Sequence, residues 1–541
     1  MSSAAALCAT DRARLLDRLE RESFDCVVIG GGISGAGVAR AASQRGWRVA
    51  LLEAHDFSSG TSSRSSKLIH GGLRYLAMGD VALVRKTALE RKQIFRMAPH
   101  LCERRWMIVP ARSYAALLAI RAGVVAYEKL GAVEGADLHR NWSAEDLARE
   151  EPAIDTRRYK HACVYREYLT DDSQLVIANL RSAAALGAAV LNHAPVEAIL
   201  RDGSTASGVE ATCALSGRRV RVRARCVINA TGPWVEAVRR LEDPGAPPLL
   251  HLSKGVHVVV SAERLPVREM VICNTRDRRS IFVIRRGDVV YLGTTDTTYA
   301  PGPNPWPEIE REDVEYLLEP AARTFRSQAL RPEDVIAAWA GLRPLIAEPG
   351  KAPAEISRRD EVLVGPAGVV TMAGGKLTGY RPMAVETVRR AAEVCGLRLA
   401  PDPEEDPPLP GGDFDGDLAA LEAKLVRETH LSERCVARLA RLHGTDTREI
   451  ARLGSEPLVS GAPLLASEVE WAVRVEGAAT LEDLLYRRLR SVWTVPETRA
   501  TATEPASVRM AKLIGWSEER RREEVQRVSA RLASELAFLA G

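Results

Sequence analysis

The chain has 541 residues, of which 46% are hydrophobic and 27% charged, and its net charge is only +4. This length exceeds what one hydrophobic core normally serves, so we expect two or three domains, and the nearly balanced charge gives no support to nucleic-acid binding. The nine cysteines are scattered without a C-x-x-C pair, which argues against a disulfide framework and against a zinc site.

The chain opens with a predicted β-α-β unit. A polar helical lead-in covers residues 1–22, a buried strand 25–29 (DCVVI), an Ala-rich helix 38–44 and a second strand 48–53 (RVALLE). The turn from Gly30 to Gly35 (GGGISG) fits G-x-G-x-x-G, whose glycines permit a sharp turn, the approach of a pyrophosphate and close helix–strand packing. The helix N-terminus then offers N–H groups and a positive dipole end to that pyrophosphate.

An acid ends the second strand of this unit. Glu53 lies 23 positions after Gly30, where a carboxylate accepts hydrogen bonds from the ribose hydroxyls of an adenosine. A lone G-x-G-x-x-G is a weak signal, but strand, helix, strand and terminal acid together predict a dinucleotide site. The acid favours FAD or NAD over a cofactor with a 2′-phosphate.

The most informative stretch is the hydroxyl-rich loop, residues 60–76 (GTSSRSSKLIHGGLRYL). Small hydroxyls, a glycine pair and the side chains of Lys67, His70 and Arg74 fall within one turn-rich segment. A chain that places hydroxyls, tight turns and cations directly after a dinucleotide fold is building a site for the rest of a large anionic cofactor and its substrate. The loop therefore predicts a flavin-dependent oxidoreductase.

The middle of the chain alternates helices with strands and then becomes rich in strands. The patterns predict helices over 85–97, 114–130 and 174–186 and strands over 190–200 and 208–214. From residue 255 to 299, the runs GVHVVV, MVIC, SIFVIRR and DVVYLGTTD are short and separated by polar turns, which is typical of an antiparallel sheet. We therefore expect a second domain inserted between parts of the first.

Two later motifs return small residues to the cofactor. Asn229 to Gly232 (NATG) ends a strand, where small side chains let the backbone approach a ligand. Ala373 to Arg381 (AGGKLTGYR) is a glycine pair followed by a lysine and a helix, so its N–H groups are expected to face the flavin ring edge and Lys376 to face the substrate. Residues 401–417, rich in Pro, Gly and acid, form the clearest linker, and the sequence beyond them is helical and charged.

The motifs IGGGISGAGVA, TSSRSSKLIHGGLRYL, NATGPWV, KGVHVVV, GTTDT, GLRPL and GGKLTGYR occur in an order that resembles the FAD-dependent sn-glycerol-3-phosphate dehydrogenases, respiratory enzymes that deliver electrons to quinone. The match runs from about residue 25 to 383, and the linker and helical tail are similar to that family's C-terminal domain. One departure is Ala41, where the family usually carries Asp; the position lies inside the first helix, so we expect an effect on packing more than on chemistry.

The resemblance implies an α/β protein: a glutathione-reductase-like FAD-binding Rossmann domain, an inserted antiparallel-sheet substrate domain and an all-α C-terminal domain. The expected boundaries are a lead-in over 1–22, an FAD-dependent region over 23–400, a linker over 401–417 and a helical domain over 418–541. Within the FAD-dependent region, the FAD domain takes about 23–100, 175–250 and 340–400, and the substrate domain about 101–174 and 251–339.

The family's reaction implies roles for particular residues. Hydride passes from C2 of sn-glycerol 3-phosphate to flavin N5 while a base takes the hydroxyl proton, and dihydroxyacetone phosphate leaves. His257 is the favoured base because an unperturbed pKa of roughly 6.5 suits proton abstraction near neutrality, although a structural role for a histidine in a strand carries equal weight. Lys376, whose pKa nearby cations would lower, is a rival base, and Arg343 completes the expected catalytic set.

The same resemblance implies the binding residues, and no metal ligand is among them. The substrate's phosphate and hydroxyls are expected to contact Arg74, Tyr75, His257, Arg343, Arg358 and Lys376. The cofactor is expected to contact Gly30, Gly31, Gly32, Ile33, Ser34, Gly35, Glu53, Ala54, Thr61, Ser62, Ser66, Lys67, Leu68, His70, Gly71, Gly72, Val196, Ala230, Thr231, Gly232, Gly375, Lys376, Leu377 and Thr378.

Several alternatives stay open at this point. An oxidase of the same fold would pass electrons to oxygen, and an amino-acid-oxidase-type enzyme would need a carboxylate-binding arginine rather than a cluster of cations. A flavin-bearing protein without turnover would need no phosphate pocket, and an NAD-linked dehydrogenase would need neither the hydroxyl-rich loop nor the late GGK motif. A homodimer is also open.

No apolar run reaches the roughly 20 residues of a spanning helix, and no signal-peptide block is present, so we expect a cytoplasmic protein. The implied quinone acceptor adds peripheral binding to the anionic inner face of the cell membrane. That contact would use the helix over 114–130 or the Arg-rich stretches Arg487 to Arg490 and Arg520 to Arg522.

Overall fold

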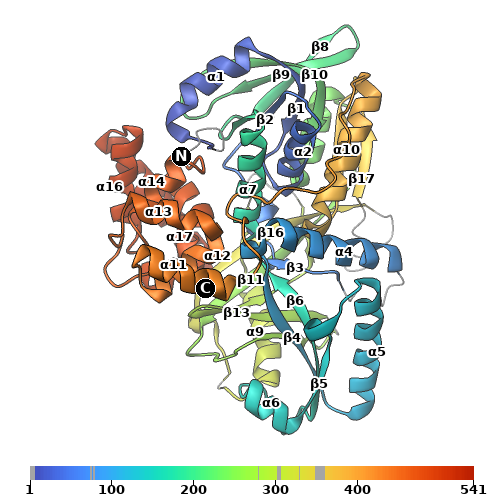
Figure 1. The fold of residues 1–541 in the computed structure, drawn as a ribbon, viewed down its shortest axis with the longest axis vertical. Helices are drawn as coiled ribbons and strands as arrows, with labels where there is room; N and C mark the ends of the chain where they lie inside the picture. The colour runs from blue at the N-terminus through green and yellow to red at the C-terminus, as the bar shows by residue number, and fades with distance from the viewer. Residues whose placement is uncertain are drawn as a thin grey trace.

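The structure, a computed structural model, describes residues 6–72, 76, 80–277, 279–300, 306–327, 329–347 and 360–540. Two β-sheets follow one another along the long axis of the molecule, and the C-terminal helices pack against one side (Figure 1). The N-terminal segment lies beside these helices, where Leu7 N–H donates to the Val475 carbonyl at 3.0 Å.

The first sheet, at the top of Figure 1, is the predicted dinucleotide-binding sheet. Its strands are β1 (Ser23–Ile29), β2 (Val49–Leu52), β7 (Ala189–Leu191), β8 (Val196–Asp202), β9 (Thr205–Thr212), β10 (Arg219–Asn229), β17 (Asp360–Val364) and β18 (Val370–Gly374). The order is β17-β18-β10-β1-β2-β7, with β9 and β8 attached to β10. Strands β18, β10, β1, β2 and β7 run parallel. The segments that follow β1, β2 and β10 therefore meet at one edge of the sheet, as ligand-binding loops do in such folds.

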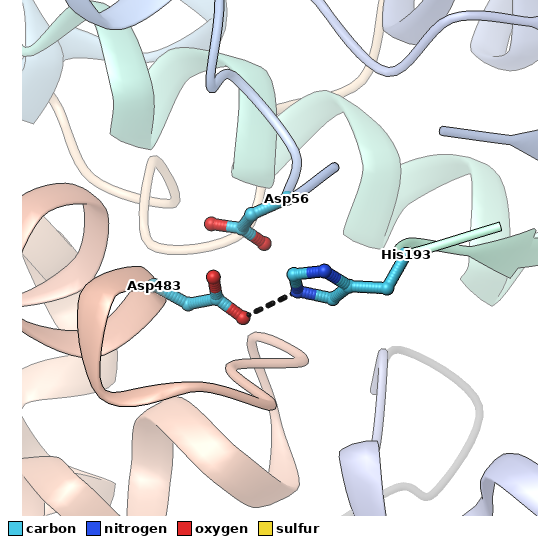
Figure 2. Close-up of side chains that lie close together, drawn as sticks. All are labelled: Asp56, His193 and Asp483. Atoms are coloured by element: carbon cyan, nitrogen blue, oxygen red, sulfur yellow. Dashed lines mark hydrogen bonds and ion pairs between the residues drawn. The ribbon is translucent and has the colours of Figure 1, made fainter. Parts of the chain in front are cut away.

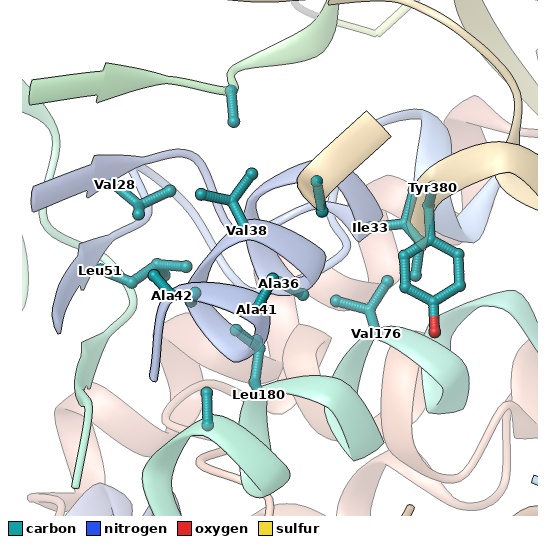
Figure 3. Close-up of a cluster of buried hydrophobic side chains, with 14 of the residues drawn as sticks. Val28, Ile33, Ala36, Val38, Ala41, Ala42, Leu51, Val176, Leu180 and Tyr380 are labelled. Atoms are coloured by element: carbon teal, nitrogen blue, oxygen red, sulfur yellow. The ribbon is translucent and has the colours of Figure 1, made fainter. Parts of the chain in front are cut away.

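Three helices cover one face of this sheet: α2 (Ile33–Gln44), α7 (Asp172–Ala185) and α10 (Tyr380–Cys395). Figure 3 shows how Val38, Leu180 and Tyr380 from these helices pack into one cluster. Gly37 allows α10 to approach α2, because a Cβ there would lie 2.8 Å from the Tyr380 ring. Ala41 is buried in the same cluster, so this position contributes to packing, as the sequence predicts. On the opposite face lie α1 (Arg12–Arg21) and α8 (Val235–Glu242).

The second sheet confirms the predicted antiparallel architecture, with one parallel pair, β4 with β12. Its strands are β3 (Leu68–Ile69), β4 (Glu103–Ala111), β5 (Arg140–Ser143), β6 (His161–Leu169), β11 (Leu250–Ser261), β12 (Met270–Asn274), β13 (Ser280–Arg286), β14 (Val289–Gly293), β15 (Thr297–Thr298) and β16 (Val335–Ile346). The order is β15-β11-β14-β13-β12-β4-β6-β3, with β16 on β11 and β5 on β6. Strand β3 is part of the hydroxyl-rich loop, so this loop reaches from the first sheet to the second.

The helices of the second sheet begin at polar caps. They are α4 (Val81–Met97), α5 (Tyr114–Leu130), α6 (Ala144–Glu150) and α9 (Arg311–Thr324). The prediction over 114–130 matches α5, which Ser113 caps by accepting from the Ala116 N–H at 3.2 Å. Helix α4 begins earlier than predicted because Asp80 caps it, accepting from the Leu83 N–H at 3.2 Å. No helix within the described ranges is long and apolar enough to cross a membrane.

The C-terminal region is helical, as predicted. Its helices are α11 (Leu418–Thr429), α12 (Glu433–His443), α13 (Thr447–Leu453), α14 (Ser467–Arg474), α15 (Ser491–Thr494), α16 (Thr503–Ile514) and α17 (Glu518–Ser534), with a π-helical turn over Asp483–Arg488. The preceding residues 401–417 form neither helix nor strand. They are nevertheless packed in place, because Leu409 is 1% exposed and Asp406 pairs with Arg40 of α2 at 3.1 Å.

Candidate functional site

The glycine turn between β1 and α2 is as tight as its motif predicts. Gly30 has a φ of +109°, and a Cβ on it would lie 2.7 Å from the Ala230 carbonyl oxygen. A Cβ on Gly35 would lie 1.8 Å from the Gly30 carbonyl oxygen. Only glycine fits these two positions, and the first-turn amides of α2 have no acceptor within the helix. The turn is therefore suited to an anionic group placed at the N-terminus of α2.

Glu53 and Ser62 close this turn from two sides. Glu53 Oε2 accepts from the Gly31 N–H at 2.6 Å, and its Oε1 accepts from the His55 N–H at 2.8 Å. Burial raises the pKa of Glu53, and these two hydrogen bonds oppose the shift. Ser62 Oγ accepts from the Ile33 N–H at 3.0 Å, which fastens the hydroxyl-rich loop to the first turn of α2.

Two further predicted segments meet the same edge of the sheet. The Ala230 N–H donates to the Ile29 carbonyl at 2.9 Å, so the NATG motif lies directly beside the glycine turn. The Ala194 N–H donates to the Glu53 carbonyl at 2.7 Å, which brings the start of β8 at Val196 near the acid. Segments from four separate parts of the sequence thus surround one position.

The first half of the hydroxyl-rich loop is tied to β16. Thr61 Oγ1 donates to the Leu342 carbonyl at 2.6 Å, and Arg64 Nη1 donates to the Ala340 carbonyl at 3.2 Å. Gly341 separates these two acceptors, and a Cβ on it would lie 2.8 Å from Arg64 Cβ. The glycine of the GLRPL motif is therefore the residue that lets the loop approach the second sheet.

The second half of the loop is tied to the GGK motif and to α5. The His70 N–H donates to Thr378 Oγ1 at 3.2 Å, and the Thr378 hydroxyl donates to the His70 carbonyl at 3.1 Å. The Gly71 N–H donates to Tyr127 Oη at 3.0 Å, and a Cβ on Gly71 would lie 2.4 Å from the Tyr127 ring. Gly71, the first glycine of the pair, is thus required by an aromatic ring from α5.

A buried ionic network lies beneath this second half. Arg91 Nη1 donates to Glu167 Oε2 at 2.9 Å, and the Tyr127 hydroxyl donates to Glu167 Oε1 at 2.9 Å. Burial raises the pKa of Glu167, and the charges of Arg91 and Lys376 oppose that shift. Lys376 therefore lies close to this network, just after Gly375, which has a φ of +87°.

His257 lies on β11 with its ring enclosed. The side chain is 2% exposed, and its Nε2 is 2.9 Å from Ser66 Oγ in the hydroxyl-rich loop. The ring stacks on Trp339 of β16, with centroids 4.9 Å apart and an interplanar angle of 12°. Gly293 lies opposite on β14, where a Cβ would fall 2.1 Å from His257 Cδ2. The imidazole therefore fits only because residue 293 has no side chain.

The electrostatic environment of His257 differs from the prediction. Burial, with the charges of Lys67 and Arg343 added to it, lowers the pKa of His257 well below its ordinary value. The expectation of an unperturbed pKa near neutrality is therefore wrong, and the ring is held in its neutral form. Burial also lowers the pKa of Lys67 to about 7; Arg490 adds to this shift and Asp172 opposes it.

Arg343 lies on β16, the strand paired with β11. Its Nη2 donates to Thr294 Oγ1 at 2.7 Å, and its Nη1 lies 3.4 Å from Asp296 Oδ1. A Cβ on Gly255 would fall 2.4 Å from Arg343 Nη2. The glycine of KGVH therefore makes room for the guanidinium, as Gly293 makes room for the imidazole. The other predicted substrate ligands, Arg74, Tyr75 and Arg358, lie outside the described residues.

Comparison with known proteins agrees with this geometry. Residues 25–381 match the family described as FAD dependent oxidoreductase, and residues 405–521 match the C-terminal domain of alpha-glycerophosphate oxidase. An aerobic glycerol-3-phosphate dehydrogenase of Staphylococcus haemolyticus (strain JCSC1435) is 35% identical over 535 residues, which cover 96% of each chain. The chain belongs to the FAD-dependent glycerol-3-phosphate dehydrogenase family.

Solved structures support this assignment. The glycerol-3-phosphate dehydrogenase from Bacillus halodurans, complexed with FAD, is 30% identical with a TM-score of 0.82, and the match covers 98% of this chain and 99% of that one. The L-alpha-glycerophosphate oxidase from Mycoplasma pneumoniae is 16% identical with a TM-score of 0.54 over 73% of this chain and 98% of that one, which shows the shared fold. The fold and the FAD cofactor that the sequence predicts are confirmed.

The C-terminal domain of this family member reaches the start of α7 and the segment after β2 through buried arginines. Arg490 is 1% exposed and pairs with Asp171 at 3.2 Å and Asp172 at 3.0 Å. Arg487 and Arg488 both pair with Asp56, which follows β2. The Arg-rich stretch over Arg487 to Arg490 therefore neutralises acids of the FAD-binding part, and the prediction that it contacts a membrane is wrong.

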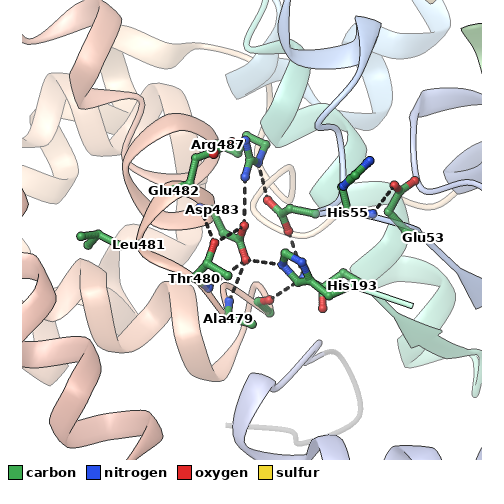
Figure 4. A network of polar contacts seen from close by, with 12 residues as sticks. Glu53, His55, His193, Ala479, Thr480, Leu481, Glu482, Asp483 and Arg487 are labelled. Carbon is green, nitrogen blue, oxygen red and sulfur yellow. Dashed lines mark hydrogen bonds and ion pairs between the residues drawn. The ribbon is translucent and has the colours of Figure 1, made fainter. Parts of the chain in front are cut away.

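Asp56, His193 and Asp483 come together at this junction in a geometry that superficially suits a metal (Figure 2). Their ligand atoms lie within 4.8 Å of one another, and His193 Nε2 is 2.9 Å from Asp483 Oδ2. However, Asp56 already accepts from two guanidinium groups, and Arg487 Nη2 donates to Asp483 Oδ1 at 2.9 Å. Figure 4 shows the contact between His193 and Asp483 crossing between the two parts of the enzyme. We interpret the cluster as an interdomain ion-pair network, because a further cation would meet two arginines.

Sequence reasoning missed several residues that shape the site. The Trp339 ring behind His257 and the buried acids Asp171 and Asp172 had no local signal of function. Asp171 and Asp172 stand where helix α7 begins, so a capping role was the only role their positions suggested. Thr294 and Asp296 could have been identified from the sequence, because both belong to the GTTDT motif that carries part of the family resemblance.

Proposed function

We propose that the chain oxidises sn-glycerol 3-phosphate to dihydroxyacetone phosphate and passes the electrons to a membrane quinone. The observation that carries this proposal is that a buried histidine, His257, and a cation on the adjacent strand, Arg343, lie near enough for the charge of Arg343 to lower the pKa of His257, beside the hydroxyl-rich loop. A base and a phosphate-binding cation are the two groups that oxidation of a phosphorylated secondary alcohol requires. The names of the relatives, aerobic glycerol-3-phosphate dehydrogenases, support the same substrate.

His257 acts as the base that takes the proton of the C2 hydroxyl. Ser66 Oγ fixes the orientation of the ring at 2.9 Å from Nε2, and stacking on Trp339 fixes its plane. We assign Nε2 as the atom that receives the proton, in the tautomer protonated at Nδ1, with the substrate hydroxyl replacing Ser66 Oγ as the partner of Nε2. The lowered pKa keeps this nitrogen unprotonated at neutral pH, at the cost of some basicity.

Arg343 and Lys376 hold the phosphate group, together with Arg74, Tyr75 and Arg358. Arg343 suits a dianion because its planar fork binds two oxygens at once. It contacts the Thr294 hydroxyl and the Asp296 carboxylate, which hold the guanidinium in position. Substrate phosphate then competes with that carboxylate for the same N–H groups.

The FAD site is formed by the edge of the first sheet and the hydroxyl-rich loop. The glycine turn and α2 fit the pyrophosphate, Glu53 fits the ribose, and Gly375 to Thr378 fit the flavin ring edge. The two glycines at 374 and 375, with φ values of +74° and +87°, let the backbone approach a planar group closely. When bound, FAD supplies the hydride acceptor at N5 of its ring.

The electron acceptor is tested by comparing two assays of the purified protein. With sn-glycerol 3-phosphate and a soluble quinone analogue, we expect dihydroxyacetone phosphate to form faster than in air without quinone, and with little peroxide. A peroxide yield equal to the product formed in air, without acceleration by quinone, would identify an oxidase. The match of residues 405–521 to the C-terminal domain of an oxidase family favours that second candidate.

We also propose that α5 contacts an anionic membrane surface. Its buried side carries Leu117 and Val124, whereas Tyr114 is 60% exposed and Leu118 is 44% exposed. Arg121 is also exposed on this helix, so apolar and basic groups face outward together.

Flotation with anionic liposomes tests this contact. The protein should float at low salt, and Leu118→Asp should abolish flotation without changing turnover on a soluble quinone analogue. A wild-type protein that stays entirely with the soluble fraction at low salt would contradict the proposal.

A further inference from the structure

A stack of aromatic rings continues from His257 into the C-terminal domain. The His257 ring lies on Trp339, and Trp339 lies 5.2 Å from Trp493 of α15, with an interplanar angle of 38°. Trp339 and Trp493 are 1% and 3% exposed. Tyr486 meets Trp493 edge-on at 5.4 Å and supports it from behind. Trp339 therefore closes the back of the imidazole, and Trp493, more than 200 positions from His257 and in a different domain, lies behind Trp339.

A second line of contacts joins the C-terminal domain to the hydrogen-bond partner of His257. Arg490 Nη2 donates to Asp172 Oδ1 at 3.0 Å. The same carboxylate accepts from Ser65 Oγ at 2.7 Å and from Lys67 Nζ at 3.2 Å. Ser65 and Lys67 flank Ser66, whose hydroxyl contacts His257. One ion pair from the C-terminal domain thus holds both neighbours of that serine.

The two lines of contact converge on Trp493. The Arg490 guanidinium also lies over the Trp493 ring at 5.1 Å, and Lys67 Nζ lies over the same ring at 5.3 Å. Burying Arg490, Lys67 and Asp172 together is costly unless each charge keeps its partner, so the arrangement tolerates little displacement. The C-terminal domain is therefore in a position to control where the imidazole stands.

We propose that Trp493 and Arg490 are positioning residues for His257, so that the C-terminal domain holds the base against the hydroxyl-rich loop. This inference rests on the proposed function for the role of His257 as base, but the placement of the ring is measured independently of the substrate. Trp493 supports Trp339, which lies behind the imidazole, and Arg490 fixes the loop that presents Ser66.

Trp471 is a matched control for Trp493. It is a buried tryptophan of the same domain, 4% exposed, and it packs edge-on against His443 at 6.4 Å. Replacing either tryptophan by leucine removes a similar volume from the same domain. Only Trp493→Leu removes the support behind His257, whereas Trp471→Leu removes the support beside His443.

The experiment measures the reactivity of each histidine and the rate of flavin reduction in the FAD-loaded proteins. Diethyl pyrocarbonate labelling, read by mass spectrometry, should be several-fold faster at His257 in Trp493→Leu and unchanged there in Trp471→Leu, with the reverse pattern at His443. Reduction by sn-glycerol 3-phosphate should slow about tenfold or more in Trp493→Leu, because catalysis is sensitive to displacements of the order of 1 Å. In Trp493→Leu, the rate of flavin reduction should also begin to fall as pH drops through about 6.5. Water that reaches the exposed ring would return the pKa of His257 toward its ordinary value, so the base would become protonated.

Two conservative variants separate positioning from general destabilisation. Trp493→Phe keeps a ring behind Trp339 and should recover most of the rate, and Arg490→Lys keeps the charge but not the planar fork and should recover less. If Trp493→Leu folds too poorly to load FAD, the labelling rate of His257 and the rate of flavin reduction are compared in the Trp493→Phe and Arg490→Lys proteins, where smaller changes are expected.

Equal rates of His257 labelling in the two leucine variants and the wild type would overturn the inference, regardless of the rate of flavin reduction. Equal labelling of His257 in wild-type, Trp493→Phe and Arg490→Lys proteins would overturn it too if the leucine variant does not fold. A wild-type flavin that sn-glycerol 3-phosphate does not reduce would instead contradict the proposed function, while the labelling pattern would still decide whether the C-terminal domain positions His257.

Discussion

A methyl group added at Gly293 should separate catalysis from cofactor binding. Gly293 pairs directly with His257 across β11 and β14, and the new Cβ would lie 2.1 Å from His257 Cδ2. Ordinary contact begins at about 3.4 Å, so the ring must move by about 1.3 Å. Trp339 blocks movement on the other face of the ring, where the centroids are 4.9 Å apart. The ring must therefore rotate, which breaks the 2.9 Å contact with Ser66.

This displacement sets the expected magnitude. A misplacement of about 1 Å in a catalytic group costs on the order of 100-fold in rate, which corresponds to about 2.7 kcal/mol in the activation free energy. The pyrophosphate and ribose parts of the FAD site should be unaffected, because the glycine turn and Glu53 lie in the other sheet. Gly293→Ala should therefore load FAD normally and reduce it about 100-fold more slowly with sn-glycerol 3-phosphate.

Stopped-flow absorbance under anaerobic conditions measures this rate, and the ratio of visible to ultraviolet absorbance measures the FAD content. Gly245→Ala is the matched control, because the nearest atom to its Cβ is an exposed carboxylate oxygen of Asp243 at 3.3 Å, far from the site. The control should keep the wild-type rate. A Gly293→Ala protein that reduces its flavin at the wild-type rate would refute the argument that the His257 ring must occupy this space.

Two further results follow from the same site, and a third from the interdomain ion-pair network. Gly255→Ala places a Cβ 2.4 Å from Arg343 Nη2 and should displace the guanidinium. In steady-state kinetics, KM for sn-glycerol 3-phosphate should rise about tenfold or more while kcat changes less. An unchanged KM would remove Arg343 from the phosphate site. His257→Ala should lower turnover about 10²- to 10⁴-fold with FAD retained, and normal turnover in this variant would exclude His257 as base. Wild-type turnover should not fall as pH drops through about 6.5, because the pKa of His257 lies well below its ordinary value. Although burial opposes the shift, Asp483 raises the pKa of His193, so this ion pair stabilises the fold fully below about pH 6.5 and loses that contribution as pH rises through the folded pKa. The difference in thermal midpoint between wild type and His193→Gln should therefore shrink from about pH 6 to 9. A constant difference would argue against the pair.

The first sheet and α5 could be predicted because their signals are local. The G-x-G-x-x-G turn must use glycine at Gly30 and Gly35 for steric reasons that hold in any such fold. Helix α5 combines apolar residues at helical spacing with a serine cap at Ser113, so both its existence and its bounds follow from neighbouring residues.

The environment of the arginines at the junction could not be predicted in this way. A run such as Arg487 to Arg490 is normally solvated, and Asp56, Asp171 and Asp172, more than 300 positions earlier, supply carboxylates that help to make its burial favourable. The pKa of His257 depends in the same way on burial by partners that the sequence does not place next to it. Residue types therefore indicated the chemistry of the site, whereas its electrostatics required the assembled structure.

The most direct test of the proposed function is anaerobic mixing of the purified, FAD-loaded protein with sn-glycerol 3-phosphate while the visible flavin absorbance is recorded. We predict rapid loss of the flavin band and formation of dihydroxyacetone phosphate equal to the flavin reduced, and no such change with glycerol, which lacks the phosphate that Arg343 and Lys376 hold. A flavin band that sn-glycerol 3-phosphate leaves untouched would contradict the substrate assignment.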